Sequence, residues 1–177
     1  MNFGNKKTKF TFGKKTPSFI FGNQKIKDVK AHCYNSFLVL DTKEKLKQYI
    51  DKPCLKACED LFDKNIETLD SGCNGENCSS CAYIVINYDG LDEKNKQTAD
   101  GLVNHKTVFF YKRDPLNARQ LSNTIKIIVP TSPEETIDMV EKKLKPIVQN
   151  FQPQKKIKRN FDYSELIAYL QKSYDKN

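Results

Sequence analysis

The residues with the most chemistry in this chain are its six cysteines, three of which are closely spaced. The stretch CNGENCSSCA contains the pattern Cys73-x4-Cys78-x2-Cys81. Thiolates spaced in this way on a loop can turn toward one metal centre, and Gly72 and Gly75 would permit the necessary backbone turns. The spacing therefore predicts Cys73, Cys78 and Cys81 as candidate metal ligands.

The fourth ligand of such a centre is left open by the sequence. Other cysteines and histidines could complete a tetrahedral zinc site: Cys33, Cys54, Cys58, His32 or His105. The alternative is that Cys54 and Cys58 lie on a buried helix face as small hydrophobic residues, while the loop thiols are free or oxidised. We expect no cofactor, with zinc and an iron–sulfur cluster as the alternatives.

Two local resemblances accompany these residues. The ten residues of the cysteine stretch resemble the iron-binding loop of plant-type 2Fe–2S ferredoxins, which implies cluster ligation and a small redox protein. That family takes its fourth thiolate from downstream, whereas Cys81 is the last cysteine here. Residues 53–96, with CEDLFDKNIETLDSG, AYIVINYDGL and DEKNK, look like stretches of functionally uncharacterised small proteins of AT-rich microbes. This second likeness implies a fold relationship only.

Residues 2–28 form three nonapeptides, NFGNKKTKF, TFGKKTPSF and IFGNQKIKD, in which Phe3, Phe12 and Phe21 each precede a glycine. Three copies rich in Gly and Lys cannot bury a core. We therefore expect an arm that is disordered until it docks. Residues 1–30 carry eight Lys and one Asp, a charge of +7 out of the chain's +8.

This basic aromatic arm predicts a non-enzymatic binding or assembly module for a polyanionic or acidic partner, either nucleic acid or a large protein assembly. Phe3, Phe12 and Phe21 would fill repeated pockets or stack on bases. The nearby lysines would neutralise acidic groups: Lys6, Lys7, Lys9, Lys14 and Lys15. One alternative is the redox or metal protein described above. Another is a disordered sticker segment, because the Phe-Gly dipeptides resemble those of nucleoporin-type chains.

Other function classes lack their signatures. There is no P-loop, dinucleotide fingerprint, zinc-protease helix or nucleophile elbow, so we lean against an enzyme and expect no catalytic residues. Adjacent His32 and Cys33 would point to opposite faces of a strand, so we do not expect them to pair as a catalytic base and nucleophile. No apolar run reaches the roughly 18 residues of a membrane span, and no secretory h-region is visible. We expect an intracellular, cytoplasmic protein with reduced thiols and no membrane partner.

The hydrophobic pattern predicts an α+β fold with a two-layer architecture. We expect a mainly antiparallel sheet of about four strands with helices packed on one face, and a loop at residues 70–80. Strands are expected at residues 32–40, 66–69, 82–88, 107–111 and 124–129. Helices are expected at residues 42–50, 53–65 and 91–103, from Ser132 to Phe151, and after residue 160.

Three regions follow from these patterns: an arm at residues 1–28, a globular domain at 29–151, and a basic linker with an amphipathic helix at 152–177. The last helix carries an apolar stripe that must pack on the domain or on a partner: Tyr163, Leu166, Ile167, Leu170 and Tyr174. The sequence leaves open which of the two it is.

Overall fold

The computed structural model of the chain describes residues 24–28, 40–75, 78–103, 105–114 and 122–156. Its elements follow the order η1 (Ile26–Asp28), α4 (Lys43–Tyr49), α5 (Lys52–Asp63), β1 (Thr68–Gly75), β2 (Cys78–Asn87), α6 (Glu93–Val103), β3 (Val108–Tyr111), β4 (Thr124–Pro130) and α7 (Ile137–Val148). The strand predicted at residues 32–40 and the helix predicted after residue 160 lie outside the described residues.

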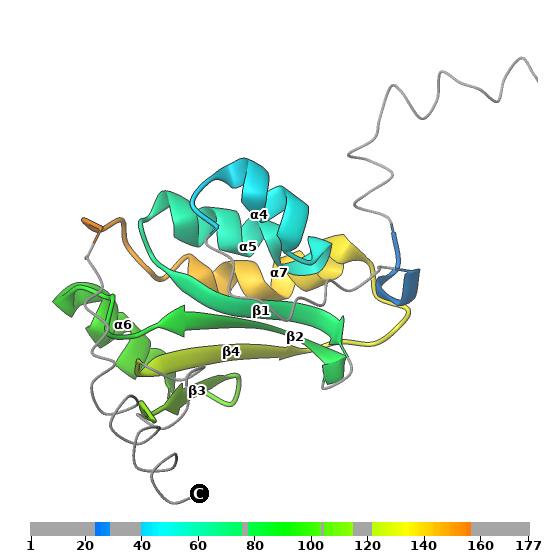
Figure 1. Cartoon of the computed structure of the whole chain (residues 1–177). Helices are drawn as coiled ribbons and strands as arrows, with labels where there is room; N and C mark the ends of the chain where they lie inside the picture. Colours follow the sequence, from blue (N-terminus) through cyan, green and yellow to red (C-terminus); the bar gives the residue numbers. More distant parts are fainter. Residues whose placement is uncertain (1–23, 29–39, 76–77, 104, 115–121, 157–177) are drawn as a thin grey trace, which may run out of the picture.

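The four strands form one antiparallel sheet in the order β1-β2-β4-β3. Figure 1 shows α5 and α7 lying along the same side of this sheet, with α4 beyond α5 and α6 near the β3 edge. The predicted two-layer α+β fold, with helices on one face of a four-stranded sheet, is therefore confirmed.

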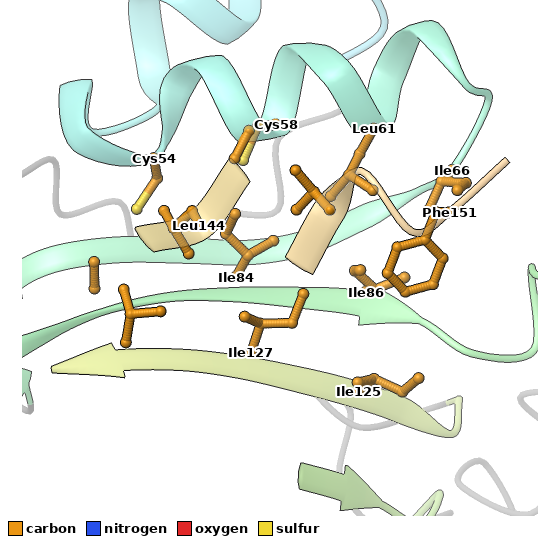
Figure 2. Packing of buried hydrophobic residues seen from close by; sticks show 14 of the residues in the cluster. Cys54, Cys58, Leu61, Ile66, Ile84, Ile86, Ile125, Ile127, Leu144 and Phe151 are labelled. Carbon is orange, nitrogen blue, oxygen red and sulfur yellow. The ribbon is translucent and has the colours of Figure 1, made fainter. Parts of the chain in front are cut away.

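The core lies between the sheet and the two helices α5 and α7. Figure 2 shows Cys54, Cys58 and Leu61 of α5 facing the apolar side chains of the sheet. On β4 the predicted alternation is confirmed, because Ile125 and Ile127 are fully buried. Burying one such side chain is worth about 1.5–3 kcal/mol, so this layer of isoleucines supplies much of the driving force.

The opposite face of the sheet is more polar. It carries Tyr83, whose ring centroid is 4.2 Å from the Lys126 ammonium and whose hydroxyl donates to Asp70 at 3.2 Å. Phe109 and Tyr111 lie on this face of β3, because they pair with Lys126 and Thr124 of β4. The sheet thus has one packed face and one face without a helix over it in the described part of the chain.

The described residues of the predicted loop are strand. Residues 70–75 belong to β1 and residues 78–80 begin β2, with Ser71 paired to Ile84 and Cys73 paired to Ala82. The strand propensity of this polar, glycine-rich stretch is poor, but pairing with the apolar strand that follows overrides local preference.

The start of α7 also differs from the prediction. The helix begins at Ile137 rather than after Ser132, with Thr136 as the N-cap whose hydroxyl accepts from the Met139 amide at 3.4 Å. Thr136 is extended and forms an isolated β-bridge with Lys25, so the helix begins only after Thr136. The apolar face predicted for the helix, including Val140 and Leu144, is buried as expected.

The segment after α7 packs on the domain through the buried Phe151 and through the side chain of Gln154. The Gln154 amide donates to Gly90 O at 2.7 Å and Asn65 O at 3.3 Å, and accepts from the Asp92 amide and from Asn95 Nδ2, each at 2.9 Å. Both hydrogens and both lone pairs of the side-chain amide are therefore used. Among the described helices, none has the length and apolar character that crossing a membrane requires.

Candidate functional site

The cysteine hairpin, residues 68–87, does not bring Cys73 and Cys81 to one centre. Cys73 pairs with Ala82 across the β1–β2 ladder, and paired residues of an antiparallel sheet share a face. Cys81 precedes Ala82, so its side chain points to the opposite face. The two predicted ligands therefore lie on opposite sides of the sheet.

Cys81 and Cys73 also differ in whether the sulfur is oxidised. Cys81 is disulfide-bonded, which differs from the expectation of reduced thiols and agrees with the alternative of oxidised loop cysteines. Cys73 is a free, fully buried thiol on the helix-covered face. The side chain of Cys78, like Cys33 and His32, lies outside the described residues. A metal centre that uses all three hairpin cysteines stays a prediction that the described geometry does not support.

Three free thiols, Cys54 and Cys58 of α5 and Cys73 of β1, belong to the same buried core cluster. Burial raises the pKa of Cys58 and of Cys73 to about 12, and raises the pKa of Cys54 well above its ordinary value. The Cys54 thiol donates to the carbonyl oxygen of Gly72 at 3.5 Å. These groups are protonated at neutral pH, so they pack as small hydrophobic residues, as predicted for Cys54 and Cys58.

A buried carboxylate that the sequence analysis missed lies beside these thiols. Asp51, at the N-terminus of α5, is 3% exposed and accepts the backbone amide of Cys73 at 2.9 Å. The signal in the sequence is an acidic residue just before Lys52-Pro53, at a helix start. This bond joins the first turn of α5 to β1, which fixes the hairpin against the helix layer.

No group of three or more His, Cys, Asp and Glu side chains is arranged to hold a metal ion within the described ranges. His105, a predicted alternative ligand, is exposed in the turn before β3, where its amide donates to Leu102 O at 2.9 Å. Asp89 instead accepts both the backbone and the side-chain amide of Asn123 at 2.8 Å. The Asp89 carboxylate therefore serves local structure, joining the loop after β2 to the residue before β4.

The second candidate site is the root of the arm, which we define as residues 24–28. Ile26 is fully buried, its amide donates to Glu135 O at 2.8 Å, and the Ile137 amide donates to Gln24 O at 3.1 Å. The Glu134 carboxylate accepts hydrogen bonds from the ammonium groups of Lys25 and Lys27, the latter at 2.7 Å.

These two lysines hold the pKa of Glu134 at about 2, because their hydrogen bonds favour the carboxylate. The end of the third nonapeptide is therefore attached to the start of α7 by backbone, apolar and ionic contacts. The residues predicted to bind a partner lie outside the described residues: Phe3, Phe12, Phe21, Lys6, Lys7, Lys9, Lys14 and Lys15.

No family model, no curated protein and no solved structure matches the chain.

Proposed function

We propose that this protein is a non-enzymatic binding or assembly module that docks its basic aromatic arm onto a polyanionic or acidic partner. The observation that carries the proposal is the arm root, where Ile26 is fully buried and Glu134 binds Lys25 and Lys27. An arm fixed at its base emerges from a defined point on the domain, so its contacts start from a constrained position.

Charge and composition support the same function. The first 30 residues contribute +7 of the formal net charge of +8, and they repeat a Phe-Gly unit three times. Lysines near an aromatic anchor suit phosphates next to unpaired bases, or carboxylates around an apolar pocket. Linked weak contacts add through effective concentration, so three copies bind better than one.

The test measures binding of the full chain to a fluorescent single-stranded oligonucleotide and to polyglutamate across a range of salt concentrations. If five arm lysines contact phosphates, log K should fall with log salt with a slope of about −3.5 for a single strand. A partner held mainly by aromatic anchors should show a shallower slope. No binding to either polymer at low salt would contradict the polyanion proposal.

A set of arm variants identifies the contacts. Replacing Phe3, Phe12 and Phe21 together by Ala should weaken binding, because each is the anchor of one repeat. The matched control replaces Phe10 and Phe19, which occupy the same arm but are not followed by glycine. Equal losses in the two sets would show that the Phe-Gly unit has no special role.

A further inference from the structure

A depression of about 340 Å³ lies between α6 and β3, and it is lined by Tyr88, Asp100, Val103 and Phe110. We call it the α6–β3 depression. Its volume equals that of roughly ten water molecules. Phe110 is 43% exposed and meets Tyr88 edge to face, with ring centroids 5.2 Å apart. Phe110 is the exposed member of this pair, and the half-buried ring of Tyr88 continues its apolar surface.

The depression lies on the helix-covered side of the sheet. Phe110 pairs with Ile125 of β4, which is fully buried, so both residues point to the same face. Phe109, the preceding residue, is equally exposed at 43% but points to the other face. The occupant must therefore approach Phe110 beside α6 and not from the open face of the sheet.

Near its end, the described chain is bonded to the segment that joins Tyr88 to α6. Gln154 is held to Gly90 O at 2.7 Å and to the Asp92 amide at 2.9 Å, and Gly90 is only two residues beyond Tyr88. A linker of four residues, 157–160, extends to at most about 14 Å. Residues 161–174 would then span about 21 Å as a helix.

The sequence of that segment has the complementary chemistry. Its apolar residues recur at helical spacing: Tyr163, Leu166, Ile167, Leu170 and Tyr174. At the edge of the depression, Asp100 carries a carboxylate that accepts the Tyr88 hydroxyl at 2.9 Å, and the preceding linker supplies Lys158 and Arg159. An apolar stripe that follows two cations matches an aromatic surface with a carboxylate on its rim.

We propose that residues 161–174 of the same chain occupy the α6–β3 depression in cis, with their apolar stripe over Tyr88, Val103 and Phe110. The C-terminal segment then covers the aromatic surface of the domain. This inference does not depend on what the N-terminal arm binds.

The test uses the full chain and its lack of tryptophan. Phe110→Trp and Phe109→Trp place a single reporter at two neighbouring, equally exposed positions on opposite faces. We expect Trp fluorescence at position 110 to be blue-shifted and protected from acrylamide quenching. At position 109 the reporter should be more readily quenched.

Introducing Leu166→Asp together with Leu170→Asp should remove the protection at position 110 and leave position 109 unchanged. The loss of two buried leucines shifts the docking equilibrium by roughly a hundredfold or more. The control is Ala168→Asp with Lys172→Gln, which makes the same charge change on the opposite side of the predicted helix. This control should keep the protection.

Circular dichroism of each variant establishes that the domain remains folded. Equal quenching at positions 110 and 109 in the parent chain, or protection that survives the double leucine change, would overturn the proposal. Protection that is lost on dilution would assign the surface to the segment of a second copy, which also overturns docking in cis.

Discussion

Cys73 and Cys81 are eight positions apart in the sequence but lie on opposite faces of one hairpin, because Cys73 pairs with Ala82. The first belongs to the core and the second is disulfide-bonded on the other face. This relationship separates two of the three thiols that the spacing had grouped. Cysteine spacing therefore indicates a metal site only where the residues lie on a loop, because neighbouring strand residues point to opposite faces.

The first prediction concerns thiol reactivity. Cys54, Cys58 and Cys73 should resist a maleimide reagent at pH 7 in the native protein and react fully in urea, because burial keeps each thiol protonated. Peptide mapping by mass spectrometry identifies the labelled positions. Rapid native labelling of Cys73 would show that the hairpin is open in solution.

The second prediction is the pH dependence of stability. The folded protein keeps the Cys58 and Cys73 thiols protonated up to a pKa of about 12, whereas the unfolded chain loses these protons above about pH 9. The unfolded state therefore binds fewer protons in this window, and the free energy of unfolding should fall as pH rises. Each thiol contributes a slope of about 1.4 kcal/mol per pH unit.

Urea unfolding at pH 8, 9, 10 and 11 measures this slope. The comparison protein is Cys58→Ala, which should show a shallower fall by the share of one thiol, while other groups titrate equally in both proteins. Parallel pH profiles for the two proteins would mean that Cys58 ionises normally in the native state.

Elements with their own hydrophobic period were predictable from the sequence. Cys54, Cys58 and Leu61 share one face of α5, and Ile125 and Ile127 alternate with Lys126 on β4. In these cases the residues facing the core are apolar, so local spacing and burial give the same answer. The choice of fold class followed from these segments.

Elements that depend on distant partners were not predictable. Residues 70–75 have almost no apolar side chains, and it is their pairing with β2 that makes them a strand. The start of α7 depends on Lys25, more than a hundred residues earlier, which bridges Thr136. Gln154 looked like part of a polar linker, because nothing near it in the sequence reveals its four hydrogen-bond partners.

The third prediction tests that glutamine. Gln154→Ala should lower the free energy of unfolding by about 3 kcal/mol, because it leaves several buried polar groups without partners. Gln154→Glu should be worse at pH 7 than at pH 4, since a carboxylate would face the carbonyl oxygens of Gly90 and Asn65. Thermal or urea unfolding at both pH values measures the difference.

The control for this position is Gln152→Ala. Gln152 is exposed and its side chain makes one long hydrogen bond, of 3.4 Å to Asn150 O. Its replacement should change stability by no more than about 0.5 kcal/mol. Similar losses at both positions would mean that the segment after α7 contributes as a whole and not through the Gln154 amide.

The last prediction concerns the arm root. Ile26→Ala should lower the free energy of unfolding by about 2–5 kcal/mol, because a fully buried side chain is truncated next to the start of α7. Met139→Ala, which shortens an apolar side chain that is 46% exposed on α7, should change the free energy of unfolding by less than about 0.5 kcal/mol.

Glu134→Gln should act differently, because it removes a dependence of the free energy of unfolding on acidic pH. The folded pKa of Glu134 is about 2, below its ordinary 4.5, so its contribution is complete above pH 4.5 and is lost as pH falls toward 2. If Ile26→Ala unfolds at the same urea concentration as the parent chain, residues 24–28 are not anchored, and the arm has no fixed point of emergence.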